Sequence, residues 1–323
     1  MKALQAHALA SVEDYHLVDL PTPAPGAGQV RIKVAACGVG YVDSLVSLGR
    51  YQVKPPLPHV PGGEFAGWVD ALGDGVEGLA LGDRVMAAGQ GGFAEFALAP
   101  ARSVTKIPDV MSFEAAAGFR INYLTAIHAL VERAGAQKGE TLLVIGAAGG
   151  VGLAAVQIGK LMGLRVIAVG SSEEKRDFAR AHGADDVIDT SPEGWRDRLK
   201  ALTGAKGPDI VFDPVCGPLF ELAFRSLAWR GRHLVIGFVG GIPALPSNLT
   251  LMKGASLVGV DLRQFLLNEA PAAAAHLAQL MEWVASGQLI APVGRVFSMS
   301  EARAALAFPL SGQGIGKTIL RIA

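Results

Sequence analysis

The stretch that decides the fold is Leu142-Leu143-Val144-Ile145-Gly146-Ala147-Ala148-Gly149-Gly150-Val151-Gly152. An apolar strand of residues 142–145 runs into a glycine-rich turn, and an apolar helix is expected over 151–162. Glycine permits a tight strand-to-helix turn, close approach of the backbone to a pyrophosphate, and packing of the helix on the strand. The start of such a helix also presents unpaired N–H groups and the positive end of its dipole to phosphates. The stretch therefore predicts a dinucleotide-binding turn.

From residue 115 onward, apolar strands alternate with helical stretches. Strand, helix, strand repeated in this way requires right-handed crossovers and a parallel sheet covered on both faces. The sequence predicts an α/β, doubly wound, six-stranded parallel sheet. Its strands are expected at 142–145, 165–169, 186–188, 210–213, 233–236 and 256–260, and its helices at 151–162, 173–182, 193–202 and 218–228.

Residues 141–159 carry no charge and are nearly long enough to span a bilayer, so a membrane helix is the alternative interpretation. The glycines within the segment, the strand before them and the helix after them fit a nucleotide-binding turn instead. We expect no membrane contact.

The chain before residue 118 has a different pattern. Short apolar runs at 29–36, 65–71, 84–88, 93–99 and 103–107 are separated by Gly and Pro, which is typical of an irregular β-rich domain. Helical stretches at 270–285 and 298–310 and a final strand at 317–322 have no place in a six-stranded sheet and are expected to return to it. The predicted domains are 1–120 completed by 262–323, and 121–261.

The composition excludes several classes of protein. A length of 323 residues suits two domains, and an apolar fraction of 50% suits globular cores. The 29 basic residues equal the 29 acidic ones, so neither nucleic acid nor a membrane surface is an expected partner. Two cysteines give no disulfide framework, and no secretory signal begins the sequence, so a cytoplasmic location is expected.

The end of the second strand favours NADPH over NAD. An NAD site places Asp or Glu about 20 residues after the glycine-rich turn, on the ribose 2′-hydroxyl. This chain has Gly170 and Ser171 there, and Lys175 follows in the next helix, where its ammonium group can pair with a 2′-phosphate. The alternative is that Ser171 and Glu174 form a capping box and Lys175 is merely solvated.

Six motifs, the glycine-rich turn among them, resemble the medium-chain dehydrogenase/reductase superfamily, and within it the zinc-independent quinone oxidoreductases related to zeta-crystallin. The likeness covers nearly the whole chain and implies a GroES-like catalytic domain beside a Rossmann NADPH-binding domain. It is carried by residues 36–43 (ACGVGYVD), 60–67 (VPGGEFAG), 82–85 (GDRV), 122–126 (NYLTA), 147–152 (AAGGVG) and 235–238 (VIGF).

The resemblance implies that the catalytic zinc of related alcohol dehydrogenases is absent. Glycine stands at Gly40 and Gly63, where those enzymes have a ligand Cys and a ligand His. The remaining alternative is a metal cluster of Cys37, His59 and Glu64. Without a Lewis acid, oxidation of a plain alcohol lacks its usual means of stabilising an alkoxide.

An acceptor that delocalises charge as it receives hydride needs less stabilisation from the protein than an alkoxide does. We expect a quinone or a conjugated enone, and no side chain acting as an obligatory acid or base. Tyr41 and Tyr51 are the candidates for the acceptor pocket, in the cleft between the domains, although either could be a packing residue.

The resemblance also assigns contacts to the cofactor. Thr125 looks like the contact to the nicotinamide ribose, the loop of Gly237 and Phe238 lies beside the nicotinamide, and Lys317 reaches the cofactor. Each has a plain alternative: a hydrogen bond within its helix, a core position and a surface position. Two departures from the family are Gly40, where many members have Asn, and Thr190, where some have Tyr. The remaining predicted contacts are Ala148, Gly149, Gly150 and Val151 with the phosphates.

Two other functions stay open. One is a reductase of enoyl thioesters or alkenals, which would use the same fold and cofactor. The other is a non-catalytic NADPH-binding protein. The apolar strand at 256–260 is expected at an edge of the sheet, and pairing of two such edges predicts a homodimer.

Overall fold

The computed structural model describes residues 1–323, and the chain divides into two compact units. The first unit holds residues 1–120 and 281–323, and the second holds 121–280. The domain boundary predicted from the sequence is at 261/262 and stays a prediction; the second compact unit extends to residue 280.

The second unit contains the predicted six-stranded parallel sheet, which is confirmed. The strand order is β10-β9-β8-β11-β12-β13, and every neighbouring pair is parallel. The order reverses between β8 and β11, which is the topological switch point where ligands bind in such sheets. The strands are β8 (Thr141–Ile145), β9 (Arg165–Val169), β10 (Asp186–Ile188), β11 (Ile210–Asp213), β12 (Arg232–Val235) and β13 (Ser256–Gly259).

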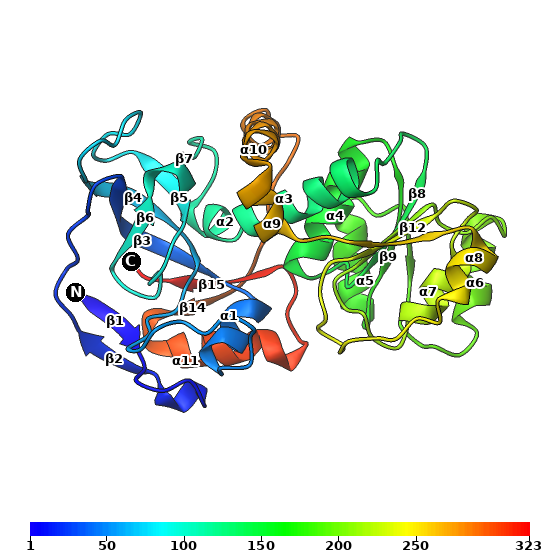
Figure 1. The fold of residues 1–323 in the computed structure, drawn as a ribbon, viewed down its shortest axis with the longest axis horizontal. Coiled ribbons are helices and arrows are strands. Elements are labelled where there is room, and N and C mark those ends of the chain that lie inside the picture. The colour runs from blue at the N-terminus through cyan, green and yellow to red at the C-terminus, as the bar shows by residue number, and fades with distance from the viewer. The chain divides into compact units, whose positions relative to one another are not determined.

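Helices cover both faces of this sheet (Figure 1). Alternate residues of β8 point to opposite faces: Leu142 lies against Gly159 of α4, whereas Leu143 joins a core cluster with Leu199 of α6 and Phe224 of α7. Burial on both faces explains why the strands are continuous apolar runs. The helices are α4 (Gly150–Leu161), α5 (Glu173–Ala181), α6 (Trp195–Thr203), α7 (Phe220–Ser226) and α8 (Asn248–Lys253).

Residues 262–280 belong to the second unit because their helices pack on its first helix. The helix α3 (Arg120–His128) continues into a π-helical turn, Ala129–Arg133. The ring of His128 stacks on Phe265 of α9 (Leu262–Asn268) at 3.9 Å, and His276 of α10 (Ala270–Ala285) lies 3.1 Å from Glu132. Each of these contacts joins two single residues that are far apart in the chain, so no periodic pattern in the sequence predicts them.

The first unit is β-rich. Its larger sheet has the order β14-β15-β3-β4-β5-β7, with β6 also paired to β3. The strand β15 (Lys317–Arg321) pairs antiparallel with β3 (Gln29–Val39), so the end of the chain completes this unit. The other elements are β1 (Lys2–Gln5), β2 (His16–Asp19), α1 (Tyr41–Ser47), β4 (Glu64–Leu72), β5 (Arg84–Ala88), β6 (Phe96–Pro100), β7 (Val104–Lys106), α2 (Phe113–Ala117), β14 (Val293–Ser298) and α11 (Ala302–Ala307).

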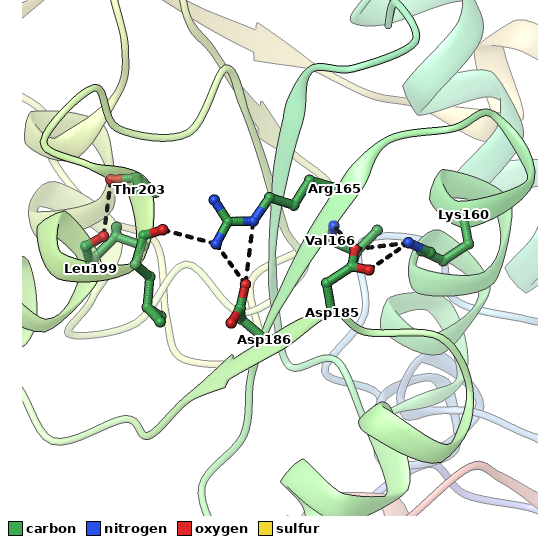
Figure 2. A network of polar contacts seen from close by, with 8 residues as sticks. Lys160, Arg165, Val166, Asp185, Asp186, Leu199 and Thr203 are labelled. Atoms are coloured by element: carbon green, nitrogen blue, oxygen red, sulfur yellow. Dashed lines mark hydrogen bonds and ion pairs between the residues drawn. The ribbon is translucent and has the colours of Figure 1, made fainter.

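Ion pairs fix the amino ends of β9 and β10 (Figure 2). Asp185 accepts hydrogen bonds from the Val166 N–H and the Lys160 ammonium, and Arg165 binds Asp186 at 2.7 Å. These contacts lie at the edge of the sheet opposite the carboxyl ends of its strands.

No helix of the chain has the length and apolar character needed to cross a bilayer.

A fork-shaped ion pair joins the start of β8 to β12. The two Arg232 Nη atoms each lie 2.8 Å from a carboxylate oxygen of Glu140, and the side chains are only 17% and 23% exposed. Burial acts to raise the pKa of Glu140, but hydrogen bonds from Arg232 and the Gln137 N–H hold it below its ordinary value of 4.5.

We predict that Glu140→Gln lowers the free energy of unfolding at pH 7 by about 1 to 3 kcal/mol. Because the folded pKa lies below the unfolded one, this stabilisation is complete above pH 4.5 and disappears as the pH falls through the folded value. The melting temperatures of the wild-type protein and the Glu140→Gln variant should therefore differ at pH 7, and this difference should narrow below pH 4.5. Glu13→Gln, whose pair with Arg303 is exposed, is the control. A difference that is constant with pH would contradict the assignment.

Candidate functional site

The glycine-rich turn lies at the carboxyl end of β8. Gly146 has a φ of +66°, and a Cβ on Gly152 would lie 2.3 Å from the Gly146 carbonyl oxygen. Gly149 precedes the first turn of α4 and offers it no side-chain cap. The N–H groups of that turn have no partner within the helix. The Gly149 N–H donates to the Gly146 carbonyl at 3.0 Å and closes the turn. Of the predicted contacts, Ala148, Gly150 and Val151 are therefore the ones whose N–H groups could bind a pyrophosphate.

Residues of α3 support this turn. A Cβ on Gly150 would lie 2.7 Å from Nδ2 of Asn122, so the Asn122 amide packs directly on the start of α4. The Tyr123 hydroxyl donates to Oε1 of Gln157 at 2.5 Å. Thr125 Oγ donates to the Ile121 carbonyl at 2.7 Å, which is the plain interpretation of this residue, although a hydroxyl bound in this way can still accept a hydrogen bond.

Two cations lie at the end of β9. Lys175 Nζ lies 3.4 Å from the Ser171 hydroxyl, and Arg176 Nη1 donates to the Gly170 carbonyl at 3.0 Å. The capping serine of α5 is Ser172, whose Oγ accepts from the Lys175 N–H, so the alternative capping box from Ser171 is not formed. Arg176 is not among the predicted contacts, because the direction of its side chain toward Gly170 depends on the helix geometry.

Two loops follow β11 and β12 at the same edge of the sheet. A Cβ on Gly237 would lie 3.0 Å from the Pro214 carbonyl oxygen, so these loops are in contact. Phe238 is 50% exposed and is therefore not a core residue. The carboxyl edge thus brings together the predicted residues that follow β8, β9 and β12.

The other predicted residues lie in the first unit. Tyr41 begins α1 and Tyr51 lies in the loop that follows; both are half-buried, and neither hydroxyl hydrogen-bonds to a protein group. Lys317 is not a surface residue: its side chain is 14% exposed, and Nζ lies 3.6 Å from the buried Glu64 carboxylate. Nζ would also lie 3.3 Å from a Cβ on Gly40.

The alternative metal cluster is not formed. No three His, Cys, Asp or Glu side chains are arranged to hold a metal ion. The Cys37 thiol donates to the Glu64 carbonyl at 3.2 Å, and burial raises its pKa well above its ordinary value. His59 Nδ1 lies 2.7 Å from the Tyr15 hydroxyl, and burial lowers the pKa of His59.

The chain is similar to known oxidoreductases along almost its entire length. A family model for a zinc-binding dehydrogenase matches residues 150–282, and one for an alcohol dehydrogenase GroES-like domain matches 26–109. Human quinone oxidoreductase is 35% identical over 305 residues, covering 94% of this chain and 92% of its own. The chain belongs to the quinone oxidoreductase family of medium-chain dehydrogenases/reductases.

Solved structures agree with this family. A mycobacterial protein in complex with NADPH has a TM-score of 0.92 and 30% identity, with both chains covered completely. Escherichia coli quinone oxidoreductase in complex with NADPH has a TM-score of 0.90 and 26% identity, again over both entire chains. This quinone oxidoreductase-like chain is therefore an enzyme with a Rossmann unit and a GroES-like unit, as the resemblance implied.

We predict that Gly152→Ala destabilises this quinone oxidoreductase-family protein, because the added Cβ meets a backbone oxygen that cannot move aside. The expected loss is about 1 to 3 kcal/mol, measured by thermal unfolding. Gly149→Ala is the matched control: its Cβ would be 3.4 Å from the same oxygen, an ordinary contact, and its φ is −82°. Equal stability of the two variants would disprove the crowding.

Proposed function

We propose that the protein transfers hydride from NADPH to a quinone or a similar conjugated carbonyl compound in the cytoplasm. The observation that carries the proposal is the donor-rich turn 146–152 at the switch point, together with a β9 end that has Ser171, Lys175 and Arg176 and no carboxylate at 170–171. The two NADPH complexes of relatives support the cofactor. Two free, buried cysteines suit a reducing compartment.

When bound, reduced nicotinamide supplies the hydride, and water supplies the proton that completes the hydroquinone. The residues of the chain bind the cofactor and the acceptor and orient them toward each other. The first turn of α4 would hold the pyrophosphate through N–H groups, and Lys175 with Arg176 would hold the 2′-phosphate. Thr125 and the loop of Gly237 and Phe238 would contact the nicotinamide end.

The acceptor would be held by Tyr41 and Tyr51, because neither hydroxyl hydrogen-bonds to another protein group. A quinone spreads the incoming charge over its ring, so orientation is the main requirement and no side chain is an obligatory acid or base. A single substitution that abolishes hydride transfer while leaving the NADPH affinity intact would contradict this mechanism.

Lys175→Met should raise KM for NADPH by about ten- to a hundredfold, because a charge-assisted bond contributes about 1.5 to 3 kcal/mol. KM for NADH should not change, since NADH has no 2′-phosphate. Steady-state kinetics with both cofactors tests this, with the exposed Lys200→Met as the control. Equal effects on the two cofactors would exclude Lys175 from the 2′-phosphate site.

Tyr41→Phe and Tyr51→Phe should each raise KM for the acceptor by about two- to tenfold, the worth of one neutral hydrogen bond. KM for NADPH should stay the same. If the acceptor KM is unaffected in both variants, the tyrosines lie outside the acceptor pocket.

The function itself is tested with a panel of quinones, enones and enoyl thioesters, each with NADPH and NADH, on protein of measured metal content. Oxidation of NADPH by simple quinones at a higher kcat/KM than by the other acceptors supports the proposal. Preference for an enoyl thioester or alkenal would assign the second function. NADPH affinity without turnover would indicate a non-catalytic binding protein.

We also propose a homodimer that pairs the β13 edges. This edge strand is mostly exposed, with Leu257 at 43%. Two exposed apolar residues lie beside it: Leu251 precedes the strand in α8, and the Trp229 ring packs on Gly254, just before the strand. Light scattering after gel filtration should give twice the chain mass, and Leu257→Lys should reduce it. A monomer at micromolar concentration would contradict the dimer.

A further inference from the structure

A buried carboxylate that the proposed function does not use lies at the carboxyl end of β11. Asp213 is 0% exposed. Its Oδ1 accepts hydrogen bonds from the N–H groups of Val215 at 2.9 Å and Cys216 at 2.8 Å. Its Oδ2 lies 3.1 Å from Nε2 of His233 on β12. A buried charge is stable only when it is bonded in this way, so the three donors and the carboxylate depend on one another.

His233 holds this carboxylate from the neighbouring strand. Its ring is 0% exposed, its Nδ1 has no hydrogen-bond partner, and Phe220 packs against it at 4.6 Å. A proton on Nδ1 would be buried against an aromatic ring with no acceptor. Nε2 is therefore the ring nitrogen that donates to Asp213.

The two N–H groups bound by Asp213 belong to the loop 214–217, which has a strained conformation. Cys216 has a φ of +52°, in the left-handed region that residues other than glycine rarely adopt. Such a conformation costs about 1 to 3 kcal/mol and persists only where its surroundings enforce it. Here the hydrogen bonds to the Asp213 carboxylate enforce it.

Loop 214–217 lies between the glycine-rich turn 146–152 and the loop that follows β12, at the carboxyl edge of the sheet. The Val215 side chain would be 3.1 Å from a Cβ on Gly146, at the start of the glycine-rich turn. On its other side, the Val215 carbonyl accepts from the Gly240 N–H at 2.7 Å, and Pro214 contacts Gly237. A shift of loop 214–217 would therefore move both the phosphate turn and the nicotinamide loop.

We infer that Asp213 is a positioning residue for the dinucleotide, acting through loop 214–217, and that His233 holds Asp213 in place. This inference rests on the proposed function. It differs from the role of Lys175, because Asp213 acts on the part of the site that NADPH and NADH share.

The test compares Asp213→Ala, Asp213→Asn and His233→Leu with Asp209→Ala. Asp209 is the matched control: it is a buried carboxylate at the opposite end of β11, and it accepts the Thr141 N–H at 2.8 Å. KM and kcat with NADPH and NADH, cofactor affinity by titration, and melting temperature are measured for each protein. Simple loss of stability lowers the active fraction and kcat, but it does not raise KM for the molecules that stay folded.

Asp213→Ala should raise KM for NADPH and for NADH by about the same factor, tenfold or more, since two charge-assisted bonds are lost. Asp213→Asn keeps an oxygen for both N–H groups and should raise both values by only about two- to fivefold. His233→Leu should act in the same direction, and Asp209→Ala should lower the melting temperature with both KM values unchanged.

Unchanged KM values in both Asp213 variants would overturn the inference, and so would an effect confined to NADPH or an equal KM effect of Asp209→Ala. If Asp213→Ala does not fold, Asp213→Asn and His233→Leu decide. Should the wild-type protein bind neither cofactor, the proposed function fails and this inference fails with it. If the wild-type protein binds both and the Asp213 variants match it, only the inference fails.

Discussion

The rest of the Rossmann unit depends on one close approach between two backbone segments. At Gly152 the first turn of α4 passes so close to the Gly146 carbonyl that an added Cβ would lie 2.3 Å from its oxygen. This approach sets the helix at the end of the central strand, with its unpaired N–H groups facing outward along the carboxyl edge of the sheet. The Asn122 amide fills the space beside Gly150, so α3 and α4 are fixed relative to the same turn.

Every other part of the site follows from the parallel order of the strands. Because all six strands point the same way, their carboxyl ends lie on one edge, and the reversal between β8 and β11 opens that edge for a ligand. The end of β9 contributes cations, and the ends of β11 and β12 contribute the two loops that Asp213 and His233 hold. The ion pairs of Asp185 and Asp186 lie at the opposite edge, where they fix the sheet without taking space from the site.

The sequence predicted the sheet, its strand count and the glycine-rich turn between β8 and α4 because each is a local pattern: apolar runs, glycine spacing and helical periodicity. Features that depend on residues distant in the chain were beyond that pattern. The stacking of His128 on Phe265, which keeps residues 262–280 in the second unit, is one such feature. The contact of Lys317 with Glu64, separated by more than half the chain, is another. The contact of Asp213 with His233 likewise depends on the pairing of β11 with β12. The cap of α5 is a local feature, but a shift of one residue decides between Ser171 and Ser172, and the structure has Ser172.

Phosphorus NMR of the protein with NADPH tests the cofactor site most directly. The 2′-phosphate of the free cofactor takes up a proton near pH 6. Held by Lys175 and Arg176, it should stay dianionic well below that pH, so its resonance should not move between pH 8 and pH 5, while the pyrophosphate resonances shift on binding to the turn. A 2′-phosphate that titrates in the complex as it does in free solution, or pyrophosphate signals that the protein leaves unchanged, would contradict the assignment of this edge of the sheet to NADPH.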